Sequence, residues 1–172
     1  LMCKIFGAPT YRGKVTFFDA YPLGDKGSYP LRTGIKTGIA IDRRTGEVFR
    51  RALYKVEYVE PGAIFKVSIR CINLPNYALG LLASVMMLLD SGFLKIGGFK
   101  TRGFGTVKVK ELRFRDREYG IDGPILRPLD EGDTEVDLSE LAYLKEGWIS
   151  SEGEDAWKVL EKLKGVWEDA RL

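Results

Sequence analysis

The stretch GGFKTRGFG, residues 97–105, decides how the rest of the chain is arranged, because its four glycines separate two segments of regular pattern. Residues 77–94, which precede it, are apolar at helical spacing, and residues 106–114, which follow it, alternate like a strand. A Walker loop or a dinucleotide fingerprint needs its glycines between a strand and a following helix, so neither motif applies. The sequence therefore predicts a glycine-rich loop between a helix and a strand.

Backbone freedom and two cations give this loop a candidate function. Glycine permits positive φ angles and close backbone approach. Exposed backbone N–H groups, together with Lys100 and Arg102, can face an anion. The alternative is a connector whose glycines serve the turn geometry and whose cations are solvated.

Alternating and β-branched segments predict a set of strands. These strands are expected at residues 14–20, 34–41, 47–52, 53–59 and 63–73. Residues 42–46, DRRTG, predict a hairpin tip between the second and third of them. Residues 1–7 fit a strand or a turn, and residues 21–33 fit a loop. Asn76 is expected to cap the helix that precedes the glycine loop.

The composition changes after the strand that follows the glycine loop. Residues 116–134 are charged and interrupted by Gly and Pro, which is typical of a linker or a surface wrap. Residues 137–145 and 153–171 predict two helices. Ser151 and Glu154 have the spacing of a capping box at the start of the second helix.

Length and composition exclude several classes of protein. At 172 residues and 45% hydrophobic content, the chain is long enough to bury one core. It has no run of 18 apolar residues, so we expect no membrane span. No signal peptide is visible and the two cysteines suggest no disulfide framework, so we expect a reduced, cytoplasmic location. The spacing of Cys3 and Cys71 is not that of a zinc site, and histidine is absent, so no metal or cofactor is expected. Without histidine, Ser–His and Cys–His nucleophile pairs are also excluded.

The net charge of +3 conceals a strong separation of charge along the chain. Residues 1–115 hold 20 Lys and Arg against 8 Asp and Glu, whereas residues 116–172 hold 7 against 16. A basic section of this kind favours a polyanionic partner. The alternative is that the acidic section packs against the basic one and neutralises it.

Arginine is concentrated on the predicted hairpin, which we call the arm. Arg43 and Arg44 lie at its tip, and Arg50 and Arg51 lie on the returning strand. Guanidinium groups with few acidic neighbours are suited to gripping phosphate. The alternative is that these arginines pair with the acidic C-terminal section.

Together the segments predict an α+β chain with an antiparallel sheet. Their order corresponds to the second part of a ferredoxin-like (RRM-like) βαββαβ unit. We expect this core over residues 1–115, and an acidic linker with a helical extension over residues 116–172. The opening strand and helix of the unit have no candidate here. A partial sheet would leave an open edge, so we expect self-association or a second chain that completes the sheet.

Four stretches of the sequence resemble a known family. They are KIFGAPTYRGKVTFFDAYP, AIDRRTGEV, VEPGAIFKVSI and GGFKTRGFGTVKV. Their order and spacing resemble the RAMP superfamily of CRISPR-associated proteins, and most closely the backbone subunit of type III effector complexes. The resemblance extends from residue 2 to about residue 114.

The resemblance implies a subunit that binds CRISPR RNA within an RNA-guided antiviral effector complex. In such complexes several copies stack along the CRISPR RNA, and each grips the RNA backbone in a basic groove beside its glycine loop. A hairpin thumb from each copy separates short segments of guide–target duplex, and here the thumb is expected within residues 22–52. CRISPR RNA, target RNA and other effector subunits are the implied partners. The implied RNA-contacting residues are Arg12, Lys14, Arg43, Arg44, Arg50, Arg51, Gly97, Gly98, Lys100, Arg102, Gly103 and Gly105.

Several aromatic residues and one carboxylate have a narrower interpretation. Tyr11, Tyr21 and Tyr29 lie near basic segments and are candidates for base stacking, although ordinary packing is the favoured interpretation. The aspartate that cuts target RNA in type III backbone subunits would lie before residue 1. Asp19 does not correspond to it, so no catalytic residue is expected in this chain.

Two other functions stay open. A RAMP endoribonuclease that matures CRISPR RNA would have to replace histidine with lysine or tyrosine as its acid or base. A ferredoxin-like protein-interaction module would have its basic section masked by the acidic one.

Overall fold

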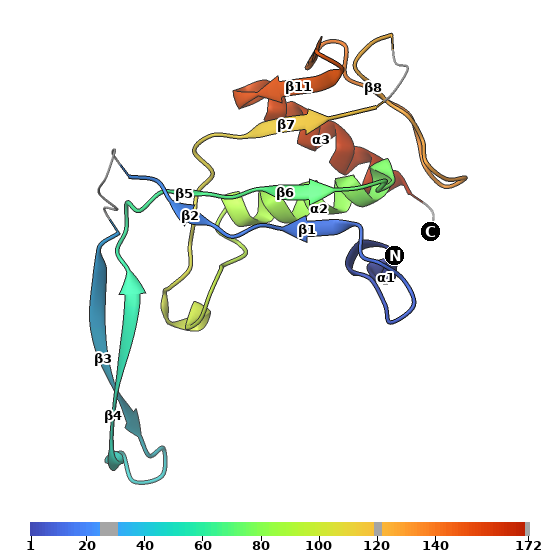
Figure 1. Cartoon of the computed structure of the whole chain (residues 1–172). Helices are drawn as coiled ribbons and strands as arrows, with labels where there is room; N and C mark the ends of the chain where they lie inside the picture. Colours follow the sequence, from blue (N-terminus) through green and yellow to red (C-terminus); the bar gives the residue numbers. More distant parts are fainter. Residues whose placement is uncertain (25–30, 119–121, 171–172) are drawn as a thin grey trace. The chain divides into compact units, whose positions relative to one another are not determined.

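The computed structural model describes residues 1–24, 31–118 and 122–170, and the chain divides into two compact units. Unit 1 comprises Leu1–Val15 and Cys71–Leu172, and unit 2 comprises Thr16–Arg70. Helices and several small antiparallel sheets alternate along the chain, which confirms the predicted α+β class (Figure 1). The helical elements are α1 (Met2–Phe6), α2 (Asn76–Asp90), α3 (Gly153–Asp169) and the 3-10 turn η1 (Lys100–Arg102).

The strands are short except in the arm. They are β1 (Val15–Phe17), β2 (Tyr21–Pro22), β3 (Thr33–Ile41), β4 (Val48–Val59), β5 (Phe65–Lys66), β6 (Ile69–Cys71), β7 (Arg113–Asp116), β8 (Ile125–Leu126), β9 (Val136–Asp137), β10 (Tyr143–Lys145) and β11 (Trp148–Glu152). The paired sets are β1–β6, β2–β5, β3–β4, β8–β9 and the three-stranded sheet β10–β11–β7.

The arm in unit 2 is the antiparallel hairpin of β3 and β4. Its register runs from Thr33 opposite Val59 to Ile41 opposite Val48, with an irregularity before Ile41. The two strands expected at residues 47–52 and 53–59 are therefore one strand, β4. Its tip forms at residues 42–46, as predicted from the sequence.

Tyrosine rings cover glycines on one face of the arm. Gly34 lies opposite Tyr58, and Gly38 lies opposite Tyr54. A Cβ atom built at Gly34 or Gly38 would lie 2.6 or 2.3 Å from the tyrosine ring, so only glycine leaves room for this packing. Aromatic rings that lie across cross-strand glycines stabilise a hairpin, which matters in a two-stranded sheet with few other contacts.

The remaining strands of the first 73 residues are shorter than predicted. The strand expected at residues 14–20 is reduced to β1, and the one expected at residues 63–73 is divided into β5 and β6. Two of the residues expected to form a loop, Tyr21 and Pro22, are instead strand β2. Residues 25–30 of that loop lie outside the described residues.

Unit 1 is built around α2, which packs against α1 on one side. Ile5 of α1 is fully buried with Leu74, Tyr77 and Ala78. This burial explains why residues 2–6 form a helix, where a strand or turn was expected over residues 1–7. The helix ends at Gly7, whose φ of 91° is readily adopted only by glycine.

The start of α2 differs from the predicted cap. Pro75 precedes the first turn, and the Asn76 side chain is buried, where its Nδ2 donates to the carbonyl oxygens of Leu126 and Thr134. The backbone N–H groups of Asn76 and Tyr77 donate instead to the carboxylate of Asp133, at 3.0 and 3.3 Å. A residue 57 positions away thus supplies the cap, which local sequence cannot reveal.

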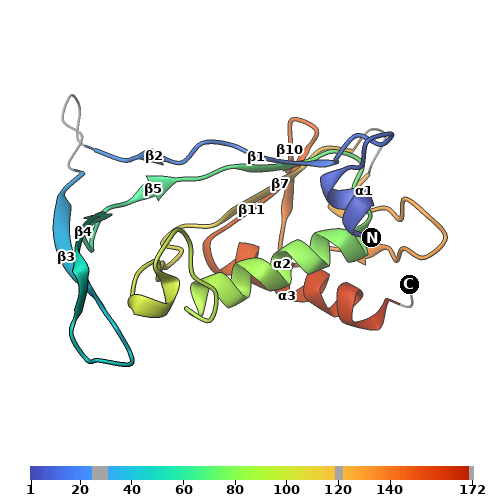
Figure 2. The same ribbon diagram turned by 90° about the horizontal axis from the view of Figure 1, so that it is seen from below.

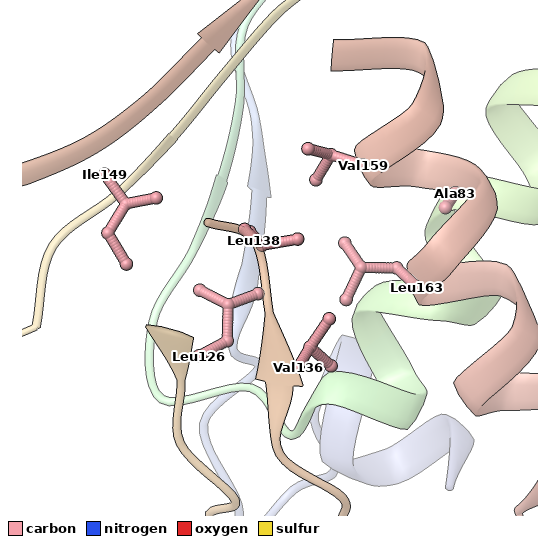
Figure 3. Close-up of a cluster of buried hydrophobic side chains, with 7 residues drawn as sticks. All are labelled: Ala83, Leu126, Val136, Leu138, Ile149, Val159 and Leu163. Atoms are coloured by element: carbon pink, nitrogen blue, oxygen red, sulfur yellow. The ribbon is translucent and has the colours of Figure 1, made fainter. Parts of the chain in front are cut away.

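Helices α2 and α3 lie side by side in unit 1 (Figures 1 and 2). Gly80 permits the close approach, because a Cβ atom there would lie 2.1 Å from the carbonyl oxygen of Leu163. Around this contact lies the larger buried cluster, whose side chains converge from α2, α3 and the strands (Figure 3). Its members are Ala83, Leu126, Val136, Leu138, Ile149, Val159 and Leu163.

The C-terminal section is more β-structured than predicted. The helix expected at residues 137–145 is absent; β9 and β10 occupy its place, because Val136 and Leu138 are drawn into the buried cluster. The expected linker at residues 116–134 contributes the fully buried Leu126. The final helix is confirmed as α3 up to Asp169.

Two further local predictions in this region are wrong. The expected strand at residues 106–114 is displaced to β7, and Val109 N instead donates to Asp90 Oδ1 at the end of α2. The capping box does not form, because Ser151 Oγ donates to the carbonyl oxygen of Leu141 at 2.6 Å. Helix α3 is preceded by Glu152 without a side-chain cap.

Candidate nucleic-acid interface

The tip of the arm presents two exposed arginines on a defined turn. Arg44 N donates to Asp42 Oδ1 at 2.8 Å, and Gly46 N donates to the Asp42 carbonyl oxygen at 2.8 Å. Gly46 has a φ of 73°, as a turn of this type requires. Among the described residues, neither Arg43 nor Arg44 forms an ion pair. Both guanidinium groups are therefore available to an external anion.

The other two arginines of the arm are placed by their backbone alone. Arg50 and Arg51 lie on β4, but their side chains lie outside what the structure describes. Of the three candidate tyrosines, Tyr11 and Tyr21 are exposed, and Tyr29 lies outside the described residues.

The glycine loop is closed at its base by one backbone hydrogen bond. Ile96 N donates to the carbonyl oxygen of Gly105 at 2.9 Å. Gly105 has a φ of 86°, and a Cβ atom there would lie 2.0 Å from the carbonyl oxygen of Ile96. No other residue type fits this position without moving the backbone, so the closed loop depends on Gly105.

Within the loop, a left-handed pair of residues flanks the turn η1. Phe99 has a φ of 53° and Gly103 a φ of 91°. Arg102 N donates to the Phe99 carbonyl oxygen at 2.8 Å, and the Arg102 guanidinium carbon lies 5.3 Å from the centre of the Phe99 ring. Phe99 thus orients Arg102 through a cation–π contact. The sequence pattern indicated the glycines and the two cations of the loop, but not this role of Phe99.

The remaining loop residues leave the backbone accessible. A Cβ atom built at Gly97, Gly98 or Gly103 would meet no other atom within 4 Å. Lys100 is exposed, and Lys95 Nζ donates to its carbonyl oxygen at 3.2 Å. The loop therefore combines an open backbone with two exposed cations, one of which, Arg102, stacks on an aromatic ring.

The two N-terminal cations differ from each other. Arg12 is exposed, whereas Lys14 is half-buried and its Nζ donates to the carbonyl oxygen of Asn73 at 2.6 Å. That bond joins the segment before β1 to the segment before α2, which gives Lys14 a structural contact as well. Arg12, Lys14 and the glycine loop belong to unit 1, and the arm belongs to unit 2.

A separate polar cluster borders a shallow pocket of about 330 Å³ in unit 1. Tyr77 Oη donates to Asp130 Oδ2 at 2.8 Å, and Lys4 Nζ lies 3.2 Å from both of these oxygens. Burial and the bond to Asp130 raise the pKa of Tyr77, and the bonds to Tyr77 and Asp130 raise the pKa of Lys4. Both groups therefore hold their protons more firmly than usual, which is the opposite of what a general base needs.

Residues 1–24, 31–118 and 122–170 contain no group of three Cys, Asp or Glu side chains placed to hold a metal ion. None of the helices in these ranges is both long and apolar enough to cross a membrane.

Comparison with known proteins identifies the family. The model of the RAMP superfamily matches residues 1–108, which is more than half of the chain. This chain therefore belongs to the RAMP superfamily of CRISPR-associated proteins, whose domains are ferredoxin-like and whose membership implies CRISPR-related RNA binding. No curated protein matches the chain significantly. The matched region includes the arm and the glycine loop, and it ends before β7.

Proposed function

We propose that this chain is an RNA-binding backbone subunit of a type III CRISPR effector complex, gripping the sugar–phosphate chain of the CRISPR RNA. The observation that carries the proposal is the closed glycine loop, whose open backbone at Gly97, Gly98 and Gly103 lies beside Lys100 and Arg102. Phosphate contacts of this kind supply affinity without reading sequence. A subunit that carries guides of different sequence requires that form of binding.

The arm adds a second group of phosphate contacts in this proposal. Arg43 and Arg44 stand exposed on a turn that Asp42 and Gly46 fix. In the type III arrangement, the arm acts as the thumb that separates short segments of guide–target duplex. The proposed partners are CRISPR RNA, target RNA and further effector subunits.

The test is binding of the full chain to single-stranded RNA, followed by fluorescence anisotropy at two salt concentrations. We expect affinity to fall at least about tenfold between 50 and 200 mM salt if several phosphates are neutralised. Oligonucleotides of unrelated sequence should bind alike. Equal binding at both salt concentrations would overturn the proposal, as would cleavage of repeat RNA by the purified chain.

The contribution of the arm is tested by reversing its charge. The double variant Arg43→Glu, Arg44→Glu should bind RNA about tenfold or more weakly, because two phosphate contacts become repulsive. The double variant Lys158→Glu, Lys164→Glu is the matched control, because it changes the net charge equally on α3. If the two variants lose affinity equally, the arm has no specific role.

A further inference from the structure

An alternating run of arginines lies just beyond the family match, in the stretch RFRDR at residues 113–117. Strand β7 places Arg113 opposite Glu152 and Arg115 opposite Ser150 of β11. Side chains two residues apart on a strand share a face. Arg113 and Arg115 therefore project from one face of the sheet β10–β11–β7, and Arg117, directly after β7, reaches Trp148 of the same sheet.

This face is the outer face of the three-stranded sheet. The opposite face supplies the fully buried Ile149 and the core-packed Phe114, and Ile149 joins the buried cluster shown in Figure 3. Strand alternation then places Trp148 on the outer face with the arginines. Helix α3 contributes Val159 and Leu163 to the same cluster, so it backs the inner side.

Two guanidinium groups contact the indole ring of Trp148. The guanidinium carbon of Arg115 lies 4.5 Å from the centre of the indole ring, and that of Arg117 lies 5.3 Å from it. On the neighbouring strand, Lys145 lies opposite Trp148, and Tyr143, which is 52% exposed, lies opposite Ser150. One sheet face thus combines two aromatic rings with cations from two strands.

The charge of this face contrasts with its surroundings. Residues 116–172 hold 16 acidic residues against 7 basic ones, yet Arg117 and Lys145 of this section join Arg113 and Arg115, which directly precede it, on the outer face. Its acidic side chain is Glu152, whose Oε1 lies 3.6 Å from Arg113 Nε. A positive surface is therefore maintained where the acidic section begins, which points to a polyanionic ligand.

We propose that this outer face is a second binding surface for single-stranded RNA, in which a base stacks at Trp148 and Arg115 and Arg117 contact the flanking phosphates. Planar aromatic rings and guanidinium groups both stack on nucleobases, and the same guanidinium groups bind phosphate bidentately. An acidic polypeptide would neutralise the cations without using the aromatic rings. The surface shares no residue with the arm or the glycine loop, because all its residues lie beyond residue 108.

Tryptophan fluorescence reports on this surface directly. The chain contains three tryptophans, and Trp157 and Trp167 lie on α3. We expect a uridine 12-mer to quench the fluorescence of the full chain, and Trp148→Phe to abolish that quenching. The matched variant Trp157→Phe should retain it. Retained quenching in Trp148→Phe, or no quenching in the unmodified chain, would overturn the proposal.

Affinity provides the second measurement. Trp148→Ala should weaken binding of the uridine 12-mer about tenfold, the loss expected for one stacked base. Arg115→Gln should also weaken this binding, and Lys158→Gln on α3 is its control. Because Arg115→Gln keeps the tryptophan, it tests the surface even if Trp148→Ala fails to fold. Polyglutamate that quenches Trp148 as strongly as RNA does would overturn the proposal in favour of an acidic protein partner.

This proposal and the proposed function fail separately. The quenching at Trp148 should persist in the double variant Arg43→Glu, Arg44→Glu, even when overall affinity falls. If RNA binds normally but does not quench Trp148 fluorescence, only the outer-face proposal is contradicted. If RNA still quenches Trp148 while the charge variants of the arm and the glycine loop bind RNA normally, the proposed function is contradicted and the outer-face proposal stands.

Discussion

At the scale of single residues, Asp116 on β7 is a carboxylate whose charged form is disfavoured by burial. Its Oδ2 is buried and has no hydrogen-bond partner within the described residues. Burial, together with the nearby charge of Glu118, raises the pKa of Asp116 to about 6. Cys71 lies in the same environment: burial first, and the charge of Asp116 second, raise the pKa of its thiol to about 11. A charge at Asp116 therefore costs folding free energy.

The sign of the resulting pH dependence follows from the two pKa values of Asp116. The folded chain holds the proton to about pH 6, whereas an unfolded aspartate loses it near pH 3.9. The stability that the protonated carboxyl supplies is complete below the pKa of Asp116 in the unfolded chain, and it is lost as the pH rises through the pKa in the folded chain. Asp116→Asn should therefore raise the unfolding free energy at pH 7.5 by about 1 kcal/mol, after allowance for partial exposure.

Thermal unfolding followed by circular dichroism at pH 4.5 and pH 7.5 measures this effect. The gain from Asp116→Asn should appear at pH 7.5 and largely vanish at pH 4.5, where the native carboxyl is already protonated. Asp122→Asn, at an exposed position, is the control and should change little at either pH. An equal shift at both pH values would show that Asp116 acts through packing rather than through its charge.

At the scale of elements, the glycine loop makes the sharpest demand on residue type. Gly105→Ala places a Cβ atom against the Ile96 carbonyl oxygen at a φ of 86°, so the closing bond must break or lengthen. We expect a loss of about 2 kcal/mol in stability, combining left-handed strain with the steric overlap. RNA affinity should also fall if the closed loop is the phosphate cradle.

Gly98 provides a matched control for Gly105. A Cβ atom at Gly98 meets no other atom within 4 Å, and its φ is not in the left-handed region. Gly98→Ala should therefore leave thermal stability close to that of the unmodified chain, which makes it the control for the stability effect of Gly105→Ala. Unchanged RNA affinity in a folded Gly105→Ala variant would separate the geometry of the loop from RNA binding.

The same elements show what the sequence can and cannot predict. Helix α3 and the arm were predicted because their signals are local: a helical apolar period, and an Asp-to-Gly turn between alternating runs. Helix α1 and strands β9 and β10 were missed, because their conformations depend on burying Ile5 and Leu138 against distant partners. Tertiary contacts override weak local preferences in such short segments.

The candidate site divides in the same way. The cations and glycines of the loop and the arm could be recognised from composition and turn chemistry. The stacking of Arg102 on Phe99, and of Arg115 and Arg117 on Trp148, depends on the folded backbone and has no local signal in the sequence. In the sequence, the alternation of arginine in RFRDR was the signal for the outer face, but its aromatic partner lies more than 30 residues away.

At the scale of the whole molecule, the arm exposes several large apolar side chains to water on the face that also carries Lys55 and Glu57. Ile35 is 67% exposed and Leu53 is 68% exposed, and Ile39 lies directly opposite Leu53. Two-stranded sheets with apolar faces and open edges tend to pair with other chains. Self-association therefore stays a prediction for the full chain, and the arm is the surface on which we expect it.

Light scattering after size exclusion, over increasing protein concentration, measures this prediction. The unmodified chain should show an average mass that rises with concentration, and Ile35→Thr with Ile39→Thr should lower that mass because the apolar contact shrinks. Ile72→Thr, at an exposed isoleucine on unit 1, should not lower it. A single monomeric species at every concentration would contradict the prediction. An association that persists in the variant with both Ile35→Thr and Ile39→Thr would instead locate the contact between copies outside the arm.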